Sequence, residues 1–139
     1  MAEVIINYFA VLVSAVVGFG IGMLWFSPVL FGNIWMKQMN LSKEKIEEAK
    51  KKGMAKNLVV AFASVLVMSY ILAHFVDYAS ATTILGGMQA GFWIWLGFIA
   101  TTMVNSVLWE QKPVNLYLIN IAHYLVVLLA MGSILAVWL

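Results

Sequence analysis

The sequence predicts an all-α integral membrane protein, a bundle of four transmembrane helices with a short interfacial helix and a cytoplasmic helix between the first two spans. Of its 139 residues, 64% are hydrophobic and 10% are charged, which is more apolar side chain than a soluble domain of this size can bury. Four uncharged stretches are each long enough to cross about 30 Å of hydrocarbon. The spans are expected at about 4–26, 57–76, 84–108 and 115–138.

The first apolar run has the hydropathy of a secretory signal but not its other features. Its start lacks lysines, and the run is longer than the apolar core of a signal peptide. We therefore expect a permanent helix.

The third uncharged stretch is longer than one crossing requires. Residues 78–83 are therefore expected to form a loop, with Thr82 or Thr83 available as the N-cap of the third span. Pro113 stands before the fourth span, where the first helical turn tolerates proline because that position has no intrahelical N–H bond to lose.

Between the first two spans, residues 28–53 are expected to form two short helices. Apolar side chains recur there at three- and four-residue spacing, as in a helix lying in the membrane interface. They are Leu30, Phe31, Ile34, Trp35 and Met39. A second, solvated helix is expected to follow Ser42 as its N-cap and to stop at Gly53.

The lysines set the expected orientation in the cell membrane. Seven of the eight lysines lie between the first two spans, and Lys112 lies between the last two. Cytoplasmic loops carry an excess of basic residues, so both loops, including residues 27–56, are expected in the cytoplasm. The amino and carboxyl termini are then expected outside.

Composition excludes several classes of function. The absence of cysteine rules out disulfides, thiolate metal sites and cysteine nucleophiles. A net charge of +2 is too small, and the lysines too localised, for a nucleic-acid surface. We expect one membrane domain over residues 1–139, with lipid and further copies of the chain as partners and with no cofactor.

Small residues four apart form a packing stripe on the first span. The stripe consists of Ala10, Ser14, Gly18 and Gly22. It lets another helix approach closely, within one bundle or between subunits. Gly87 and Gly91 begin a similar stripe on the third span. Helix packing is the ordinary role of such stripes, and a pore lining is the alternative.

Polar side chains are expected to share one level near the cytoplasmic face. At about 1.5 Å rise per residue, four of them fall within roughly two helical turns of that face. They are Asn57, Asn105, Asn120 and His123. Polar groups in a bilayer need partners or water. This inner polar layer therefore predicts either hydrogen bonds that fix the bundle or a functional pocket centred on His123.

A second polar pair is expected toward the outer face. His74 and Asp77 are three residues apart at the end of the second span, where the carboxylate can pair with the imidazole. An anchoring contact and a proton relay both remain open. His123, which has no carboxylate at ligand spacing, does not predict a metal site.

The segment 22–35, GMLWFSPVLFGNIW, resembles the G-x-x-W-[YF]-S-P-x-x-F-G-x-x-W signature of the domain of unknown function 1761 family of small prokaryotic membrane proteins. Segments 91–102 and 120–123 are also similar to that family. The resemblance implies a four-helix membrane protein and brings no established activity. We expect the motif to form a corner, with Ser27 as cap and Pro28 as the start of the interfacial helix. The corner residues are Trp25, Ser27, Pro28, Phe31, Gly32 and Trp35.

Three functions remain open from the sequence. The first is a homo-oligomeric transport or permeation protein for a small solute or ion, because several copies can line a path that four short helices cannot enclose alone. The second is a structural or partner-binding subunit. The third, an enzyme on a lipophilic substrate, is disfavoured because the spans hold no arginine and no paired acid and base.

Overall fold

The computed structural model describes residues 4–138, and the regular elements in that range are all helices. Four helical stretches are long and apolar enough to cross a membrane, which confirms the predicted number and order. They are α1 (Tyr8–Trp25), α4 (Met54–Tyr78), Ile84–Leu108 and α8 (Val114–Trp138). The short helices α2 (Gly32–Gln38) and α3 (Lys43–Lys51) lie between α1 and α4.

Side-chain caps explain where several helices begin. Asn7 Oδ1 accepts hydrogen bonds from the backbone N–H groups of Phe9 and Ala10, each at 3.1 Å. This cap starts α1 at Tyr8, later than the expected start at residue 4. Thr83, and not Thr82, caps the third span, and Ser42 caps α3 as expected. A hydroxyl or amide oxygen at these positions satisfies N–H groups that have no partner inside the helix.

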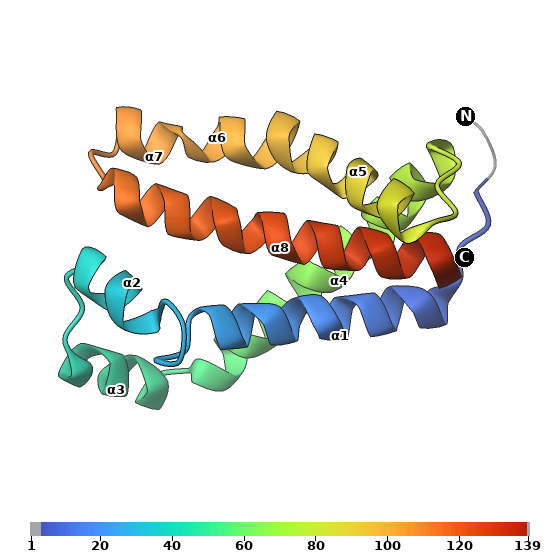
Figure 1. Cartoon of the computed structure of the whole chain (residues 1–139). Helices are drawn as coiled ribbons and strands as arrows, with labels where there is room; N and C mark the ends of the chain where they lie inside the picture. Colours follow the sequence, from blue (N-terminus) through green and yellow to red (C-terminus); the bar gives the residue numbers. More distant parts are fainter. Residues whose placement is uncertain (1–3, 139) are drawn as a thin grey trace.

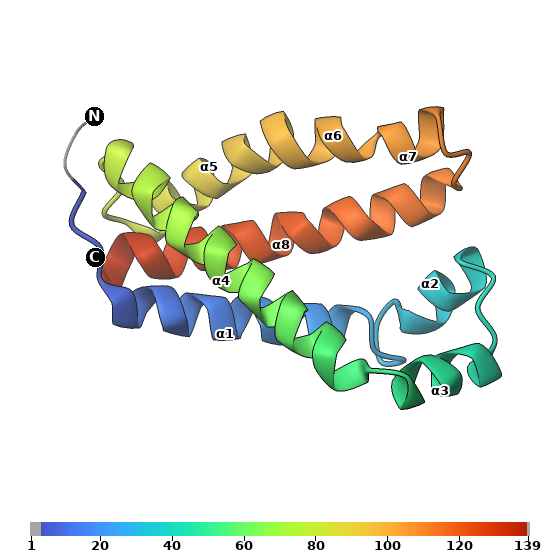
Figure 2. The ribbon, with the colours of Figure 1, turned by 180° about the vertical axis from the view of Figure 1, so that it is seen from behind.

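The long helices form a layer of three with α4 crossing it. Helix α8 lies in the middle of the layer, between α1 and the third span, and α4 runs obliquely across one face of this layer (Figures 1 and 2). The buried core lies where α1, α4 and α8 meet. It contains Ala10, Val11, Leu72, Ala73, Val76, Val127, Leu128, Met131, Leu135 and Ala136.

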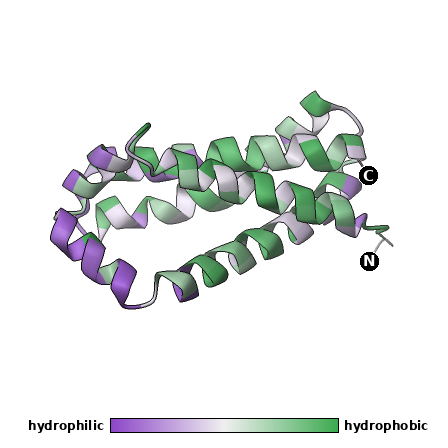
Figure 3. Cartoon of the chain, turned by 90° about the horizontal axis from the view of Figure 1, so that it is seen from below, coloured by the Kyte–Doolittle hydropathy of each residue, from purple (hydrophilic) through white to green (hydrophobic). Residues whose placement is uncertain are grey.

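Both lysine-bearing loops lie at the same end of the molecule. Helices α2 and α3 and the turn between α7 and α8 lie at one end, whereas α1 begins and α8 ends at the other (Figure 1). Hydrophilic residues concentrate at the end that carries α3 (Figure 3). The fold thus gathers the lysines at one end of an apolar bundle.

Glycine permits a close approach between the third span and α8. A Cβ added to Gly87 would lie 2.1 Å from the backbone oxygen of Gly132, and one added to Gly91 would lie 2.4 Å from that of Leu128. Neither contact leaves room for a methyl group. Of the three glycines in this seam, Gly87 and Gly91 were predicted from the sequence and Gly132 was not.

The packing stripe of α1 faces α4 and α8. Ala10, Ser14 and Gly18 are buried, and Ser14 Oγ donates to the backbone oxygen of Met131 at 3.5 Å. A Cβ added to Gly18 would lie 2.6 Å from the sulfur of Met131. Within one chain, these three residues of the stripe are therefore covered by neighbouring helices.

The sequence suggested one continuous α-helix for the third span, but the structure divides this span into several segments. Helix α5 (Ile84–Ile94) passes into a π-helical segment, Trp95–Ala100, which is followed by α6 (Thr101–Met103) and α7 (Asn105–Leu108). The i→i+5 bonds of a π-helix disturb the regular backbone ladder. Side chains supply further donors there: Thr101 Oγ1 bonds to Gly97 O at 2.7 Å, and Tyr117 OH to Ala100 O at 2.7 Å.

Candidate functional site

The motif corner is a tight backbone turn between α1 and α2. The N–H of Phe31 donates to the carbonyl of Trp25, and the N–H of Gly32 to that of Ser27, both at 2.9 Å. A Cβ on Gly32 would lie 2.4 Å from the backbone oxygen of Phe26. Because backbone atoms cannot move aside as a flexible side chain can, the turn requires glycine.

Two details of the corner differ from expectation. Helix α2 begins at Gly32 and not at Pro28, and no side chain caps it. Ser27 Oγ instead donates back to the carbonyl of Leu24 at 2.6 Å. The turn bonds from residues 30–32 occupy the segment that a longer helix would need.

Aromatic side chains of the corner pack against the first half of α8. Trp25 Nε1 donates to the backbone oxygen of Ile119 at 3.2 Å, and the Trp25 and Phe31 ring centroids lie 4.7 Å apart. The Phe26 ring contacts both the Trp35 ring, at 5.6 Å, and the His123 ring, at 5.0 Å. The motif thereby positions two aromatic rings beside His123.

The hydrogen bond from Trp25 removes a local partner from His123. The other histidine, His74, bonds through Nδ1 to the carbonyl four residues earlier, that of Tyr70, at 2.9 Å. For His123, the carbonyl four residues earlier is that of Ile119, which accepts from Trp25. Nδ1 of His123 is buried and has no hydrogen-bond partner among residues 4–138.

Gly22 lies against the opposite nitrogen of the same ring. A Cβ on Gly22 would lie 3.0 Å from His123 Nε2, which is closer than such contacts normally are. Gly22 is both the last residue of the packing stripe and the first residue of the motif, and its lack of a side chain leaves space for the imidazole of His123.

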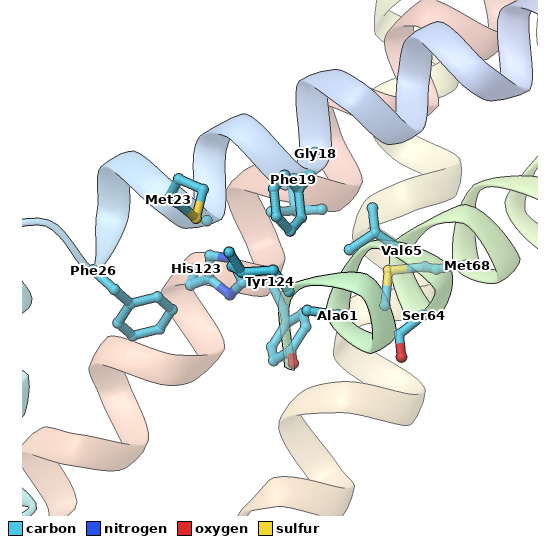
Figure 4. A pocket seen from close by; sticks show the side chains of 13 residues that line it. Gly18, Phe19, Met23, Phe26, Ala61, Ser64, Val65, Met68, His123 and Tyr124 are labelled. Atoms are coloured by element: carbon cyan, nitrogen blue, oxygen red, sulfur yellow. The ribbon is translucent and has the colours of Figure 1, made fainter. Parts of the chain in front are cut away.

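His123 lines a cleft of about 510 Å³ between α1, α4 and α8. His123 and Tyr124 extend from α8 into this space, facing α1 and α4 (Figure 4). Apart from Ser64, His123 and Tyr124, the lining consists of apolar residues, and none of the lining residues is charged. The lining is Gly18, Phe19, Gly22, Met23, Phe26, Leu58, Ala61, Ser64, Val65, Met68, His123, Tyr124 and Val127. We call this the α1–α4–α8 cleft.

The cleft exists because the residues of α4 that are buried against the bundle all lie in its second half. Ser69 Oγ donates to the Val11 carbonyl at 2.9 Å, and both groups are buried; Leu72, Ala73 and Val76 are also buried. Toward its start, α4 diverges from α8 (Figure 2). The Phe19 and Phe62 rings, 5.6 Å apart, join α1 to α4 there.

The inner polar layer predicted from sequence is divided by the structure. Asn105 and Asn120 line a second cavity of about 310 Å³, together with Glu110 and Lys112, whereas His123 lines the α1–α4–α8 cleft. Asn57 is exposed in the first turn of α4 and lines neither cavity. Equal depth did not bring these side chains together, because the rotation of α8 and the divergence of α4 direct them to different surfaces.

The outer pair is also apart. His74 bonds to its own helix through Tyr70, and Asp77 is exposed. Within the part of the chain that the structure describes, the two side chains form no ion pair. The local carbonyl supplies the partner that the carboxylate was expected to provide.

Two residues at the site were not identified from the sequence. Tyr124 lines the cleft beside His123, and Trp95 Nε1 donates to the Ile121 carbonyl at 2.7 Å. Tyr124 directly follows His123, and this adjacency was an available signal. Nothing in the sequence indicated which carbonyl Trp95 would reach.

Comparison with known proteins gives one match. The family model described as "Protein of unknown function (DUF1761)" matches residues 9–136, a range that includes the corner, the cleft and the glycine seam. No curated protein and no solved structure matches the chain.

Proposed function

The chain belongs to the DUF1761 family of proteins of unknown function, as its motif indicated, and we propose that it binds a small lipophilic molecule inside the membrane. The observation that carries this proposal is the α1–α4–α8 cleft, which is about 510 Å³ in volume and mostly apolar. Sites for small molecules are typically concave and apolar, with a few polar groups that orient the ligand. Ser64, His123 and Tyr124 supply those groups here.

The depth of the cleft favours entry from lipid. His123 lies nine residues into α8 and Ser64 ten residues into α4, which places both about 14 Å from the start of their helices. At that depth the divergence of α4 from α8 opens toward the hydrocarbon. A lipophilic molecule can therefore reach the cleft sideways, without crossing water.

The orientation follows from the grouped lysines, and we place the end with α2 and α3 in the cytoplasm. The chain has no cysteine, so single cysteines at Ala49 and Ser80 can be introduced without further changes. In intact cells, a membrane-impermeant maleimide should label Ser80→Cys and leave Ala49→Cys unlabelled until the cells are opened. The reverse pattern would contradict the orientation.

Binding can be tested with a photoreactive long-chain alcohol in lipid nanodiscs. We expect cross-links at the cleft residues, identified by mass spectrometry of peptides. Ala61→Phe should abolish labelling, because Ala61 lines the cleft. Ala63→Phe is the matched control, since Ala63 is exposed on the same helix and does not line it. Equal labelling of both variants, or labelling confined to the outer helix surfaces, would overturn the proposal.

The geometry favours binding over the transport path that the polar layer suggested, because Asn105 and Asn120 line one cavity and His123 lines another. A homo-oligomer that conducts a solute would require a different surface. Size determination in nanodiscs and flux measurements in liposomes would distinguish the two. Solute flux by a defined oligomer, unchanged by Ala61→Phe, would favour transport.

A further inference from the structure

We infer that the ligand of the α1–α4–α8 cleft is an uncharged amphiphile with one polar end, such as a long-chain or ring-bearing alcohol, whose oxygen bonds to Nε2 of His123. This inference rests on the proposed function and names the class of molecule that the cleft accepts. Three features of the cleft support it: the lack of charged lining residues, the free edge of the imidazole, and the extension of the cleft from His123 toward the buried core.

The first feature excludes a charged end group. None of the lining residues is Asp, Glu, Lys or Arg. Removing a charge from water without an opposite charge nearby is strongly unfavourable, and more so at membrane depth. A carboxylate or a quaternary ammonium in the cleft would be left unpaired, whereas a hydroxyl or carbonyl needs only one hydrogen bond.

The second feature locates that hydrogen bond. Nε2 lies beside Gly22, where the absence of a Cβ leaves space, and His123 lines the cleft. Nδ1 is buried on the other side of the ring, so Nε2 is the nitrogen that a ligand can reach. A hydroxyl can either donate to this nitrogen or accept from it.

Trp25 is the positioning residue for this edge of the ring. The Trp25 indole N–H donates to the Ile119 carbonyl, four residues before His123. His123 therefore lacks a local acceptor of the kind that Tyr70 provides for the Nδ1 atom of His74. A proton carried on Nε2 then faces the cleft, where a ligand oxygen can accept it.

The third feature orients the rest of the molecule. Beyond His123 the cleft continues toward Gly18, Val65 and Val127, next to the buried core. Gly18 and Phe26, which line the cleft from α1 and its C-cap, are eight residues apart, or about 12 Å along a helix. The apolar body of the ligand therefore points to the bilayer centre, and its polar end points to the lysine-bearing end.

The class can be tested by competition against the photoreactive alcohol in nanodiscs. Three competitors share one chain length: dodecane, dodecanol, and dodecanoate ionised at about pH 9. We expect dodecanol to compete about five- to tenfold better than dodecane, the gain from one hydrogen bond, and dodecanoate to compete worst. His123→Phe should reduce dodecanol to the level of dodecane, while the same change at His74 leaves the order intact.

A second variant covers the case in which His123→Phe fails to fold. Gly22→Ala places a methyl group against Nε2, and it should also remove the preference for dodecanol while circular dichroism stays unchanged. The preference should persist in Gly20→Ala, because a Cβ at Gly20 meets nothing within 4 Å.

The outcomes separate the two proposals. If dodecane and dodecanol compete equally, and Ala61→Phe blocks labelling, the cleft binds lipophiles but the inferred polar end is wrong. If dodecanoate competes best, the inference is also wrong. If the probe does not label the cleft, the proposed function itself fails.

Discussion

The two halves of the bundle use similar residues but pack them differently. Near the chain ends, α4 lies on the bundle with Leu72, Ala73 and Val76 buried. Near the lysine-bearing loops, α4 diverges (Figure 2), and its residues Leu58 and Ala61 line a cleft. Hydropathy alone does not distinguish these halves, so apolar composition does not decide whether a membrane helix end is packed or open.

The glycines show what makes the difference. In the half near the chain ends, which we call the closed half, Gly87 and Gly132 face each other's backbone. A Cβ on Gly132 would lie 2.3 Å from the oxygen of Gly87. In the half near the lysine-bearing loops, which we call the open half, Gly22 faces the imidazole of His123 instead. Glycine against backbone brings helices together, whereas glycine against a ring leaves the ring at the edge of a cavity.

The largest change in stability is expected for a substitution in the closed half. Gly132→Ala should lower the free energy of unfolding by about 3 kcal/mol, because the added methyl group meets backbone atoms that cannot yield. Gly20→Ala should raise it by up to about 1 kcal/mol, through helix propensity alone. Denaturation in detergent, followed by circular dichroism, measures both. An unfolding free energy in Gly132→Ala that equals or exceeds that of the wild type would show that the glycine seam does not hold the closed half.

The corner that supports the open half should be nearly as sensitive. Gly32→Ala places a Cβ 2.4 Å from the Phe26 carbonyl and should cost about 2 kcal/mol. It should also weaken labelling of the cleft, because Phe26 contacts His123. Gly97→Ala is the control, since its Cβ meets nothing within 4 Å. Wild-type stability and labelling in Gly32→Ala would show that the corner does not shape the cleft.

Two serines on α4 allow the two halves to be compared through smaller changes in stability. Ser69 bonds across to the Val11 carbonyl of α1, so Ser69→Ala should destabilise the protein by about 1 kcal/mol. Ser64 bonds within its own helix, to Val60, and Ser64→Ala should change stability by less than about 0.5 kcal/mol. The same unfolding measurement compares them. Equal losses would mean that α4 is held as firmly in its first half as in its second.

The smallest effect in free energy is expected at Trp25. Trp25→Phe keeps an aromatic ring but frees the Ile119 carbonyl, so stability should fall by no more than about 1 kcal/mol. His123 can then bond to that carbonyl as His74 bonds to Tyr70. We expect its proton to move from Nε2 to Nδ1, a change that ¹⁵N chemical shifts of the imidazole report. Unchanged shifts for His123 would show that Trp25 does not position the ring.

The candidate site could be predicted only in part. His123 and the corner around Trp25 and Phe31 were identified from the motif and from the rarity of titratable groups in membrane spans. Their contact was not predicted, because the two segments are almost a hundred residues apart along the chain. Asn120 and His123 share an i, i+3 spacing, yet they line different cavities.

The sequence by itself determined the number of long helices, the cap Ser42, the choice of Thr82 or Thr83 as the cap of the third span, and the grouping of lysines between particular spans. These properties depend on hydropathy and on hydrogen bonds among residues close in sequence. Tertiary structure alone decided the glycine seam at Gly132, the π-helical segment Trp95–Ala100 and the cleft beside His123. Each of these depends on how far a helix is rotated and at what angle it crosses its neighbours, and no local pattern encodes those quantities.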